Sequence, residues 1–199
     1  MKNRAYHHGD LKESLVEAAK SMITDDGVNN FSLRKAALAV GVSQAALYRH
    51  FSGKEQLLAA LACNCFLQVG NELQQAYEHA KDDPREKLKA VGLAYVIFAS
   101  DNPNLYRLMF DASLSDKQRY PELTDARRQA LKWAAKSVTP IAQARAHADE
   151  KRLDNTKFLL QSSIHGVASF VIEGLAPNYK TLASMIDALV DQTLVSRSP

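Results

Sequence analysis

The sequence predicts an all-α protein of about nine helices, arranged in two domains at 1–53 and 54–199. Only 8 Gly and 6 Pro occur among the 199 residues, which favours helices over a sheet with many turns. Apolar residues recur at helical spacing, whereas no segment alternates between apolar and polar residues over a useful length. Residues typical of helix starts and helix ends follow one another in regular order along the chain.

Capping residues and glycines delimit the first four helices. Asp10 with Glu13 forms a capping pair that predicts the first helix start. Ser32 and Ser43 are expected to cap the second and third helices, and Gly41 separates these two. A further capping box at 52–55 opens the fourth helix. The expected helices are therefore about 10–24, 32–40, 43–51 and 52–81.

Prolines and polar breaks delimit the remaining five helices. Asp83 with Pro84, and Asn102 with Pro103, predict two helix starts, because proline fits the first turn of a helix. Pro140 is expected to kink or split the seventh helix. The expected helices are about 83–100, 102–110, 121–148, 153–175 and 180–195, with a flexible loop at 111–121.

Charge and cysteine usage restrict the function only weakly. The net charge of +3 permits binding to a polyanion without requiring it. Cys63 and Cys65 stand two residues apart in a predicted helix, so they point to different faces and cannot form a disulfide. We expect free thiols, as in a reducing cytosol, and no metal or cofactor. The first residues lack the apolar core of a signal peptide, and no apolar run approaches membrane-spanning length, so a cytoplasmic protein is expected.

Residues 27–61 carry the most informative pattern, which is a short helix, a Gly-centred turn and a second short helix. This is a helix-turn-helix arrangement, in which the second helix of the motif can present one face to DNA. We expect Val42, Leu47 and Phe51 to point inwards and hold the motif together. The residues expected to face outwards are Ser43, Gln44, Ala45, Arg49 and His50.

The outward residues have side chains that suit DNA. Gln44 can form two hydrogen bonds with an adenine edge, Arg49 can do the same with a guanine, and Ala45 can contact a thymine methyl group. Ser43 at the free N–H groups of the helix start, and Lys54 at the next helix, suit backbone phosphates. A capped surface helix without any role in DNA binding is the alternative.

Residues 11–61 also contain a specific combination of residues. These are Gly27, Ser32-Leu33-Arg34, Ala37, Gly41-Val42-Ser43, Leu47-Tyr48-Arg49-His50-Phe51, Lys54-Glu55 and Leu57-Leu58. With them the stretch resembles the DNA-binding domain of the TetR family of bacterial regulators. The resemblance implies a three-helix unit with its third helix in the major groove. It places Ser32, Tyr48, His50 and Lys54 at phosphate-contact positions and adds Arg34 to the DNA-binding set. Leu38 and Ala39 stand where the family more often has charged residues, and we expect them to pack against the fourth helix.

The same resemblance implies that the C-terminal region binds a small molecule. An apolar cavity is expected in helices five to eight, with residues drawn from Tyr95, Phe98, Tyr106, Met109, Phe110, Trp133, Phe158, Gln161 and His165. Each of these can instead be a core residue, and His165 can also be an interface residue. His165 and Gly166 match a subfamily named for a Trp-His-Gly signature, although Gln161 stands where Trp is usual.

The last two predicted helices suit a homodimer, which the family forms as a four-helix bundle. An apolar stripe on the last helix consists of Leu182, Met185, Ile186, Leu189 and Thr193. A small-residue strip on the preceding helix consists of Ser162, Gly166 and Ser169, and Phe170 lies beside it. A monomer that uses both stripes internally is the alternative.

The sequence therefore predicts a ligand-responsive, one-component transcription regulator. We expect a repressor that binds a palindromic double-stranded operator as a homodimer and is released by a small-molecule effector. One alternative is an all-α enzyme with His165 as general base, but no G-x-S-x-G, H-E-x-x-H or phosphate-binding Gly loop occurs. A helical protein-interaction adaptor is the other. The N-terminal Lys2, Arg4, His7 and His8 are expected to form either a phosphate-touching arm or a solubilising tail.

Overall fold

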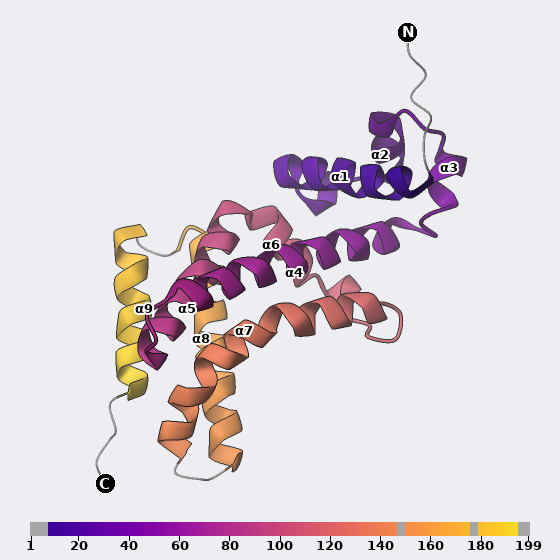
Figure 1. The fold of residues 1–199 in the computed structure, drawn as a ribbon. Helices are drawn as coiled ribbons and strands as arrows, with labels where there is room; N and C mark the ends of the chain where they lie inside the picture. Colours follow the sequence, from indigo (N-terminus) through magenta and orange to yellow (C-terminus); the bar gives the residue numbers. More distant parts are fainter. Residues whose placement is uncertain (1–7, 147–149, 176–178, 195–199) are drawn as a thin grey trace. The chain divides into compact units, whose positions relative to one another are not determined.

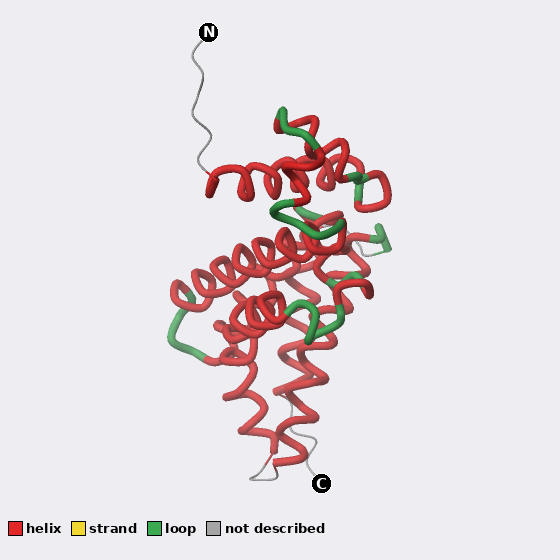
Figure 2. Tube along the Cα trace, turned by 90° about the vertical axis from the view of Figure 1, so that its right-hand side faces the viewer, coloured by secondary structure: helices red, strands yellow, loops and turns green. Residues whose placement is uncertain are grey.

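A computed structural model describes residues 8–146, 150–175 and 179–194 of the chain. These residues form nine α-helices and two short 3-10 helices, and no strand occurs among them (Figure 1, Figure 2). The predicted all-α class is thereby confirmed. The α-helices are α1 (His8–Asp26), α2 (Leu33–Val40), α3 (Gln44–Tyr48), α4 (Lys54–His79), α5 (Pro84–Asp101), α6 (Pro103–Met109), α7 (Pro121–Ala146), α8 (Glu150–Ile172) and α9 (Tyr179–Leu194). The 3-10 helices are η1 (Val28–Asn30) and η2 (Ala112–Leu114).

Local capping sets the starts of several helices as the sequence predicts. Ser32 Oγ accepts a hydrogen bond from the Lys35 N–H at 3.3 Å and caps α2. Asp83 Oδ1 accepts from the N–H groups of Arg85 and Glu86, at 2.9 and 3.0 Å, in the first turn of α5. Side-chain oxygens at these positions satisfy backbone donors that have no partner within the helix.

Two helix boundaries differ from the prediction, and one predicted alternative is excluded. α1 begins at His8, so Asp10 lies within the helix and not at its start. α3 ends at Tyr48, and the residues up to Phe51 form a turn in which the His50 N–H donates to the Leu47 carbonyl at 2.9 Å. α7 is one helix with Pro140 inside it, so of the two predicted effects of this proline, a kink or a split, the split does not occur. Proline removes one helical hydrogen bond, but the buried residues on both sides of it, Val138, Ile141 and Ala142, hold the helix in place.

The chain divides into two compact units. Unit 1 comprises Met1–Phe66 and Asn102–Arg127, and unit 2 comprises Leu67–Asp101 and Arg128–Pro199. Both α4 and α7 therefore contribute residues to each unit.

Unit 1 is built on α1, which packs against α2 and α6. Its fully buried apolar side chains include Leu15, Ile23, Leu47, Phe51, Leu57, Leu61, Phe66, Leu105 and Leu108. Each such side chain contributes about 1.5–3 kcal/mol when it is removed from water. Polar contacts add to this packing, because Asn104 Nδ2 donates to the Thr24 carbonyl at 3.1 Å and Arg127 Nη2 donates to the Met109 carbonyl at 3.1 Å.

Unit 2 is organised around α5, which packs against both α8 and α9. Gly92 of α5 lies where the three helices meet, since a Cβ atom there would be 3.5 Å from Ile164 of α8 and from Ile186 of α9. Gly70 of α4 allows an even closer approach, because a Cβ atom there would be 2.9 Å from the Cα atom of Ala130 in α7. Arg85 with Asp191, and Lys89 with Asp187, form ion pairs that link α5 to α9. Among the described helices, none combines the length and apolarity that a membrane crossing requires.

Candidate nucleic-acid interface

The turn between α2 and α3 depends on one glycine. Gly41 has φ +75° and ψ +29°, in the left-handed region. The Gly41 N–H donates to the Leu38 carbonyl at 3.0 Å, and the Val42 N–H donates to the Ala37 carbonyl at 2.9 Å. This pattern is a Schellman motif, which satisfies the last carbonyls of α2 and turns the chain towards α3. The predicted helix-turn-helix geometry is present.

Helix α3 has only five residues and is fixed by its surroundings. Ser43 caps it, with Oγ accepting from the Ala46 N–H at 3.2 Å. Leu47 and Phe51 are 0% and 1% exposed, so they anchor the motif as the sequence predicts, whereas Val42 is only partly buried. Helices this short are not stable alone, so the core of unit 1 sets the direction in which the outward residues of α3 point.

The side chains predicted to read bases are on the exposed face of α3. Gln44, Ala45 and Arg49 are all exposed, and Tyr48 beside them is 54% exposed. An amide, a methyl group and a guanidinium within six residues form a surface that can hydrogen-bond and contact base edges. His50 differs from this set, because it is partly buried.

The residues predicted to bind phosphate have differing local roles. Arg34 is exposed, and Ser32 is partly exposed while its hydroxyl caps α2. Lys54 donates from Nζ to the Val28 carbonyl at 3.2 Å and lies 5.8 Å from the centre of the Phe31 ring. Lys54 thereby joins α4 to η1, a structural role that the sequence did not indicate. Sequence reasoning also did not single out Lys35, a second exposed cation next to Arg34. Its Nζ donates to the Asn30 carbonyl at 3.3 Å.

The expectation that Leu38 packs against the fourth helix is wrong. Leu38 is 78% exposed and Ala39 is also exposed. Helix α2 buries its opposite face, where Ala36 and Ala37 are 0% and 1% exposed, so position 38 is turned towards solvent. Of the predicted N-terminal arm, Lys2, Arg4 and His7 lie outside the described residues, as does the side chain of His8.

Six of the residues predicted to line a ligand cavity belong to unit 2. Tyr95 and Phe98 are buried, and the Tyr95 hydroxyl lies 3.0 Å from His165 Nδ1. Burial lowers the pKa of His165 below its usual value. Trp133 packs beside Tyr77, with 5.4 Å between ring centres. Phe158 and Gln161 are exposed on α8, because the inner face of that helix is formed by Leu160, Ile164 and Ala168.

The other three predicted cavity residues belong to unit 1. Tyr106 and Met109 are 3% and 0% exposed and form part of its core. Phe110 is 39% exposed, and its ring centre is 5.0 Å from that of Tyr106 and 5.9 Å from that of Phe66. These contacts are those of core packing at the end of α6.

The predicted dimer residues divide into an open face and a buried one. On α8, Ser162 and Phe170 are exposed, Ser169 is partly buried, and a Cβ atom added at Gly166 would meet no atom within 4 Å. On α9, Ile186 is 1% exposed because it packs against Gly92 within the same chain. The prediction that Ile186 belongs to the dimer surface is therefore wrong. Met185 and Leu189 are partly buried, and the side chains of Leu182 and Thr193 lie outside the described residues.

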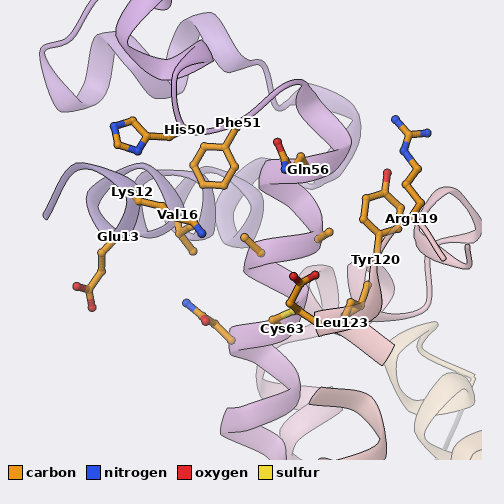
Figure 3. A pocket seen from close by; sticks show the side chains of 14 residues that line it. Lys12, Glu13, Val16, His50, Phe51, Gln56, Cys63, Arg119, Tyr120 and Leu123 are labelled. Carbon is orange, nitrogen blue, oxygen red and sulfur yellow. The ribbon is translucent and has the colours of Figure 1, made fainter. Parts of the chain in front are cut away.

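Sequence reasoning missed a cavity of about 490 Å³ in unit 1, shown in Figure 3. Its walls come from α1, the residues after α3, the first half of α4, and residues 119–123. Segments so far apart in sequence give no local signal that they meet. Cys63 lines this cavity, and burial raises its pKa; burial also raises the pKa of the nearby Cys65 to about 11. Among the described residues, no group of three or more His, Cys, Asp or Glu side chains is placed to hold a metal ion.

Two family models match the chain. The model of bacterial regulatory proteins of the tetR family matches residues 15–61, which contain α2, α3 and the Gly41 turn. The model of the tetracyclin repressor-like C-terminal domain matches residues 88–195, which is more than half of the chain.

Two curated proteins are similar to this chain over more than half of its length. The uncharacterized HTH-type transcriptional regulator YobS of Bacillus subtilis is 25% identical over 158 residues, covering 79% of this chain and 77% of that protein. The nucleoid occlusion factor SlmA of Photobacterium profundum is 30% identical over 108 residues, covering 54% of this chain and 55% of that protein.

Solved structures share the fold over nearly the full length. A protein of unknown function from Rhodococcus sp. RHA1 has a TM-score of 0.76 at 29% identity, covering 96% of this chain and 97% of that one. A TetR transcriptional regulator from the same source has a TM-score of 0.63 at 20% identity, covering 96% of this chain and all of that one.

Proposed function

Because this chain belongs to the tetR family of bacterial regulatory proteins and is a transcription regulator with a DNA-binding helix-turn-helix, we propose that it is a ligand-responsive repressor. It binds a palindromic operator as a homodimer and is released by a small-molecule effector. The observation that carries the proposal is the exposed face of α3, where Gln44, Ala45 and Arg49 point away from a fully buried anchor.

The proposed interface separates base reading from phosphate binding. Gln44, Ala45 and Arg49 read base edges in the major groove, because their side chains match adenine, thymine and guanine. Ser32, Arg34, Ser43, Tyr48, His50 and Lys54 contact the sugar–phosphate backbone. The Lys54 ammonium has three N–H donors and uses one on the Val28 carbonyl, so it can still donate to a phosphate.

The proposed homodimer uses the open face of α8. At 100° per residue, Phe158, Leu159, Ser162, Gly166 and Phe170 share one face of this helix. Phe158, Leu159 and Phe170 are 69%, 63% and 58% exposed, which is unusual for side chains of this size in one chain. The open space at Gly166 allows a second helix to approach closely. The proposed interface also includes Met185 and Leu189 of α9, which are partly buried within one chain. Two-fold symmetry then presents two copies of α3 to the two half-sites of the operator.

The proposed switch requires an effector that favours the DNA-free conformation. A ligand with equal affinity for both conformations shifts nothing. We place the effector site in the C-terminal domain, 54–199, near the hydrogen-bonded Tyr95 and His165, with the DNA-binding domain at 1–53. Helix α4 is continuous from Lys54 to His79, so it can transmit a displacement between the two domains.

Binding to DNA fragments from around the protein's own gene tests this function. We expect saturable, sequence-specific and salt-sensitive binding in a gel-shift assay. Arg49→Ala should cost about 1–3 kcal/mol of binding free energy and relax the preference at one base position. Tyr48→Phe removes only a hydroxyl group, so it should weaken binding equally on preferred and altered sites.

The matched control is Lys151→Ala, which also removes one exposed cation but lies on α8. It should leave operator affinity nearly unchanged. The proposal fails if the folded protein binds no genomic fragment specifically, or if the Lys151 and Arg49 variants lose affinity alike. A uniform loss with Arg49→Ala would reject base reading by this residue.

A further inference from the structure

The cavity in unit 1 is large enough for a small organic ligand. Its volume of about 490 Å³ falls within the range of about 300–1,000 Å³ that is typical of ligand sites. The apolar part of its wall includes Val16 of α1, Ala59 of α4 and Leu123 of α7, all of them buried. The cavity therefore combines an apolar surface, which can bind the body of a ligand, with a polar margin (Figure 3).

Two cations on the cavity wall are each held over an aromatic ring. Lys12 Nζ lies 5.9 Å from the centre of the Phe51 ring, and Arg119 Cζ lies 5.4 Å from the centre of the Tyr120 ring. Neither cation forms a salt bridge within the described part of the chain. Cation–π contacts position a charge without neutralising it, so both cations can still pair with an anion.

Tyr120 provides an independent sign of a missing partner. The residue is 5% exposed, and its buried hydroxyl has no hydrogen-bond partner among the described residues. A buried hydroxyl without a hydrogen-bond partner is destabilising, so it is uncommon in native proteins unless a ligand or water supplies the partner. Figure 3 shows the Tyr120 ring beside α4, with its hydroxyl directed to the end of the cavity where Gln56 and Arg119 lie.

The carboxylates at the cavity indicate which end suits an anion. Figure 3 shows the Glu13 carboxylate turned away from the Tyr120 side of the cavity. Glu122 is close enough to Cys63 to raise the pKa of that thiol, an effect that exceeds the opposite one of Lys12. The part of the cavity at Cys63 is therefore less favourable for negative charge than the part at Arg119, where a cation lines the wall.

We propose that this cavity binds a small aromatic carboxylate, with its carboxylate at Arg119 and the Tyr120 hydroxyl and its ring on the apolar wall. Arg119 supplies charge-assisted hydrogen bonds, and the Tyr120 hydroxyl gains the acceptor that it lacks in the free protein. The site lies in unit 1, whereas Tyr95 and His165, near which the effector site is proposed, belong to unit 2, so it is a second site.

The cavity also shares residues with the end of the DNA-binding motif. His50 and Phe51, which follow α3, line it, and Phe51 is one of the two side chains that anchor the motif. A ligand there contacts the support of α3 directly. Binding at this site is nonetheless a property of the free protein, so its test does not depend on DNA.

Cys63 provides a local readout for this test. Its alkylation by iodoacetamide can be followed by mass spectrometry on the full-length protein, with 2-naphthoate as the probe and naphthalene-2-carboxamide as its uncharged control. We expect millimolar 2-naphthoate to slow alkylation of Cys63 saturably, and the amide to bind roughly tenfold more weakly because it lacks the charge. Cys65 is 2% exposed and serves as the internal reference for unfolding.

Three variants locate the probe. Arg119→Gln and Tyr120→Phe should each weaken protection of Cys63 by roughly tenfold. Lys117→Gln removes an exposed cation from the same segment, and this residue does not line the cavity. In this variant 2-naphthoate should therefore protect Cys63 as well as it does in the parent protein. Tyr120→Phe should also keep or raise the melting temperature of the free protein, because it removes a hydroxyl that has no partner among the described residues.

The proposal is overturned if 2-naphthoate gives no saturable protection, or if the amide protects equally well. It is also overturned if Lys117→Gln loses as much protection as Arg119→Gln, since the effect would then come from general charge. If the parent protein binds no operator, the proposed repressor function is rejected, whereas the result of the Cys63 protection experiment still stands.

Discussion

Gly70→Ala tests the closest helix approach in unit 2. The added Cβ atom would lie 2.9 Å from the Cα atom of Ala130 and 3.3 Å from its Cβ atom. Real Cβ atoms do not approach a backbone carbon so closely, and a backbone atom cannot rotate away. Helices α4 and α7 must therefore move apart locally in this variant.

Two opposing terms decide the size of the effect. Alanine is favoured over glycine inside a helix by about 1 kcal/mol, whereas overpacking a tight core costs about 1–3 kcal/mol. Because the clash is with backbone, we expect the free energy of unfolding to fall by about 1–2 kcal/mol in total. Gly92→Ala is the matched control, since its Cβ atom would only reach ordinary contact with Ile164 and Ile186 at 3.5 Å. It should be neutral or stabilising by up to about 1 kcal/mol.

Urea denaturation followed by helical circular dichroism measures both variants. The protein concentration is kept fixed, because the stability of a dimer depends on it. The two midpoints should move in opposite directions, or only the Gly70 midpoint should fall. If Gly70→Ala is as stable as the parent, or both variants shift alike, the close approach of α4 and α7 is refuted.

Three further predictions concern the motif and the Tyr95–His165 pair. Gly41→Ala should lower the free energy of unfolding by about 1–2 kcal/mol, although no atom lies within 4 Å of the added Cβ, because φ is +75°. Gly41→Asn should lose less in the same urea assay, and equal losses would exclude the left-handed conformation as the cause. Ser43→Ala removes the α3 cap and should cost about 1 kcal/mol in thermal denaturation, with Ser43→Asp retaining most of the stability. Burial lowers the pKa of His165 from its usual 6.5, so near that pH the unfolded chain binds more protons than the folded one. Stability should then fall as the pH drops from about 7.5 to about 5.5, and His165→Gln should lose less of it over this range; parallel melting curves for the two proteins would contradict this.

Features that depend on neighbouring residues were predictable from the sequence. Ser32, Gly41 and Ser43 act through hydrogen bonds within a few residues, so their types and spacing defined the helix-turn-helix before any packing was known. The inward direction of Leu47 and Phe51 followed from helical spacing in the same way. The base-reading and phosphate-binding roles remain predictions that the DNA-binding experiments address.

Features that depend on distant segments were not predictable. Ile186 has the same apolar character as its neighbours in the α9 stripe, and only its contact with Gly92 shows that it is used inside the chain. Leu38 showed the opposite error, since an apolar side chain was assumed to be buried and is 78% exposed. Aromatic residues gave an equally weak signal, because Tyr106 and Phe110 contribute to one unit and Tyr95 and Phe98 to the other. Periodicity identifies an apolar face, but it does not identify what covers that face.

The shortness of α3 connects its DNA-reading side chains to the cavity of unit 1. Five residues cannot form a stable helix alone, so the direction of Arg49 depends on the Ser43 cap, the Gly41 turn and the buried Phe51. Phe51 both anchors the motif and lines the cavity, and Lys12 Nζ lies 5.9 Å from the centre of its ring. A change in cavity packing that moves this ring must therefore alter the support of Arg49, whereas a change on the exposed side of α2 need not. Occupancy of the cavity should consequently affect operator affinity more than any substitution at the exposed Leu38.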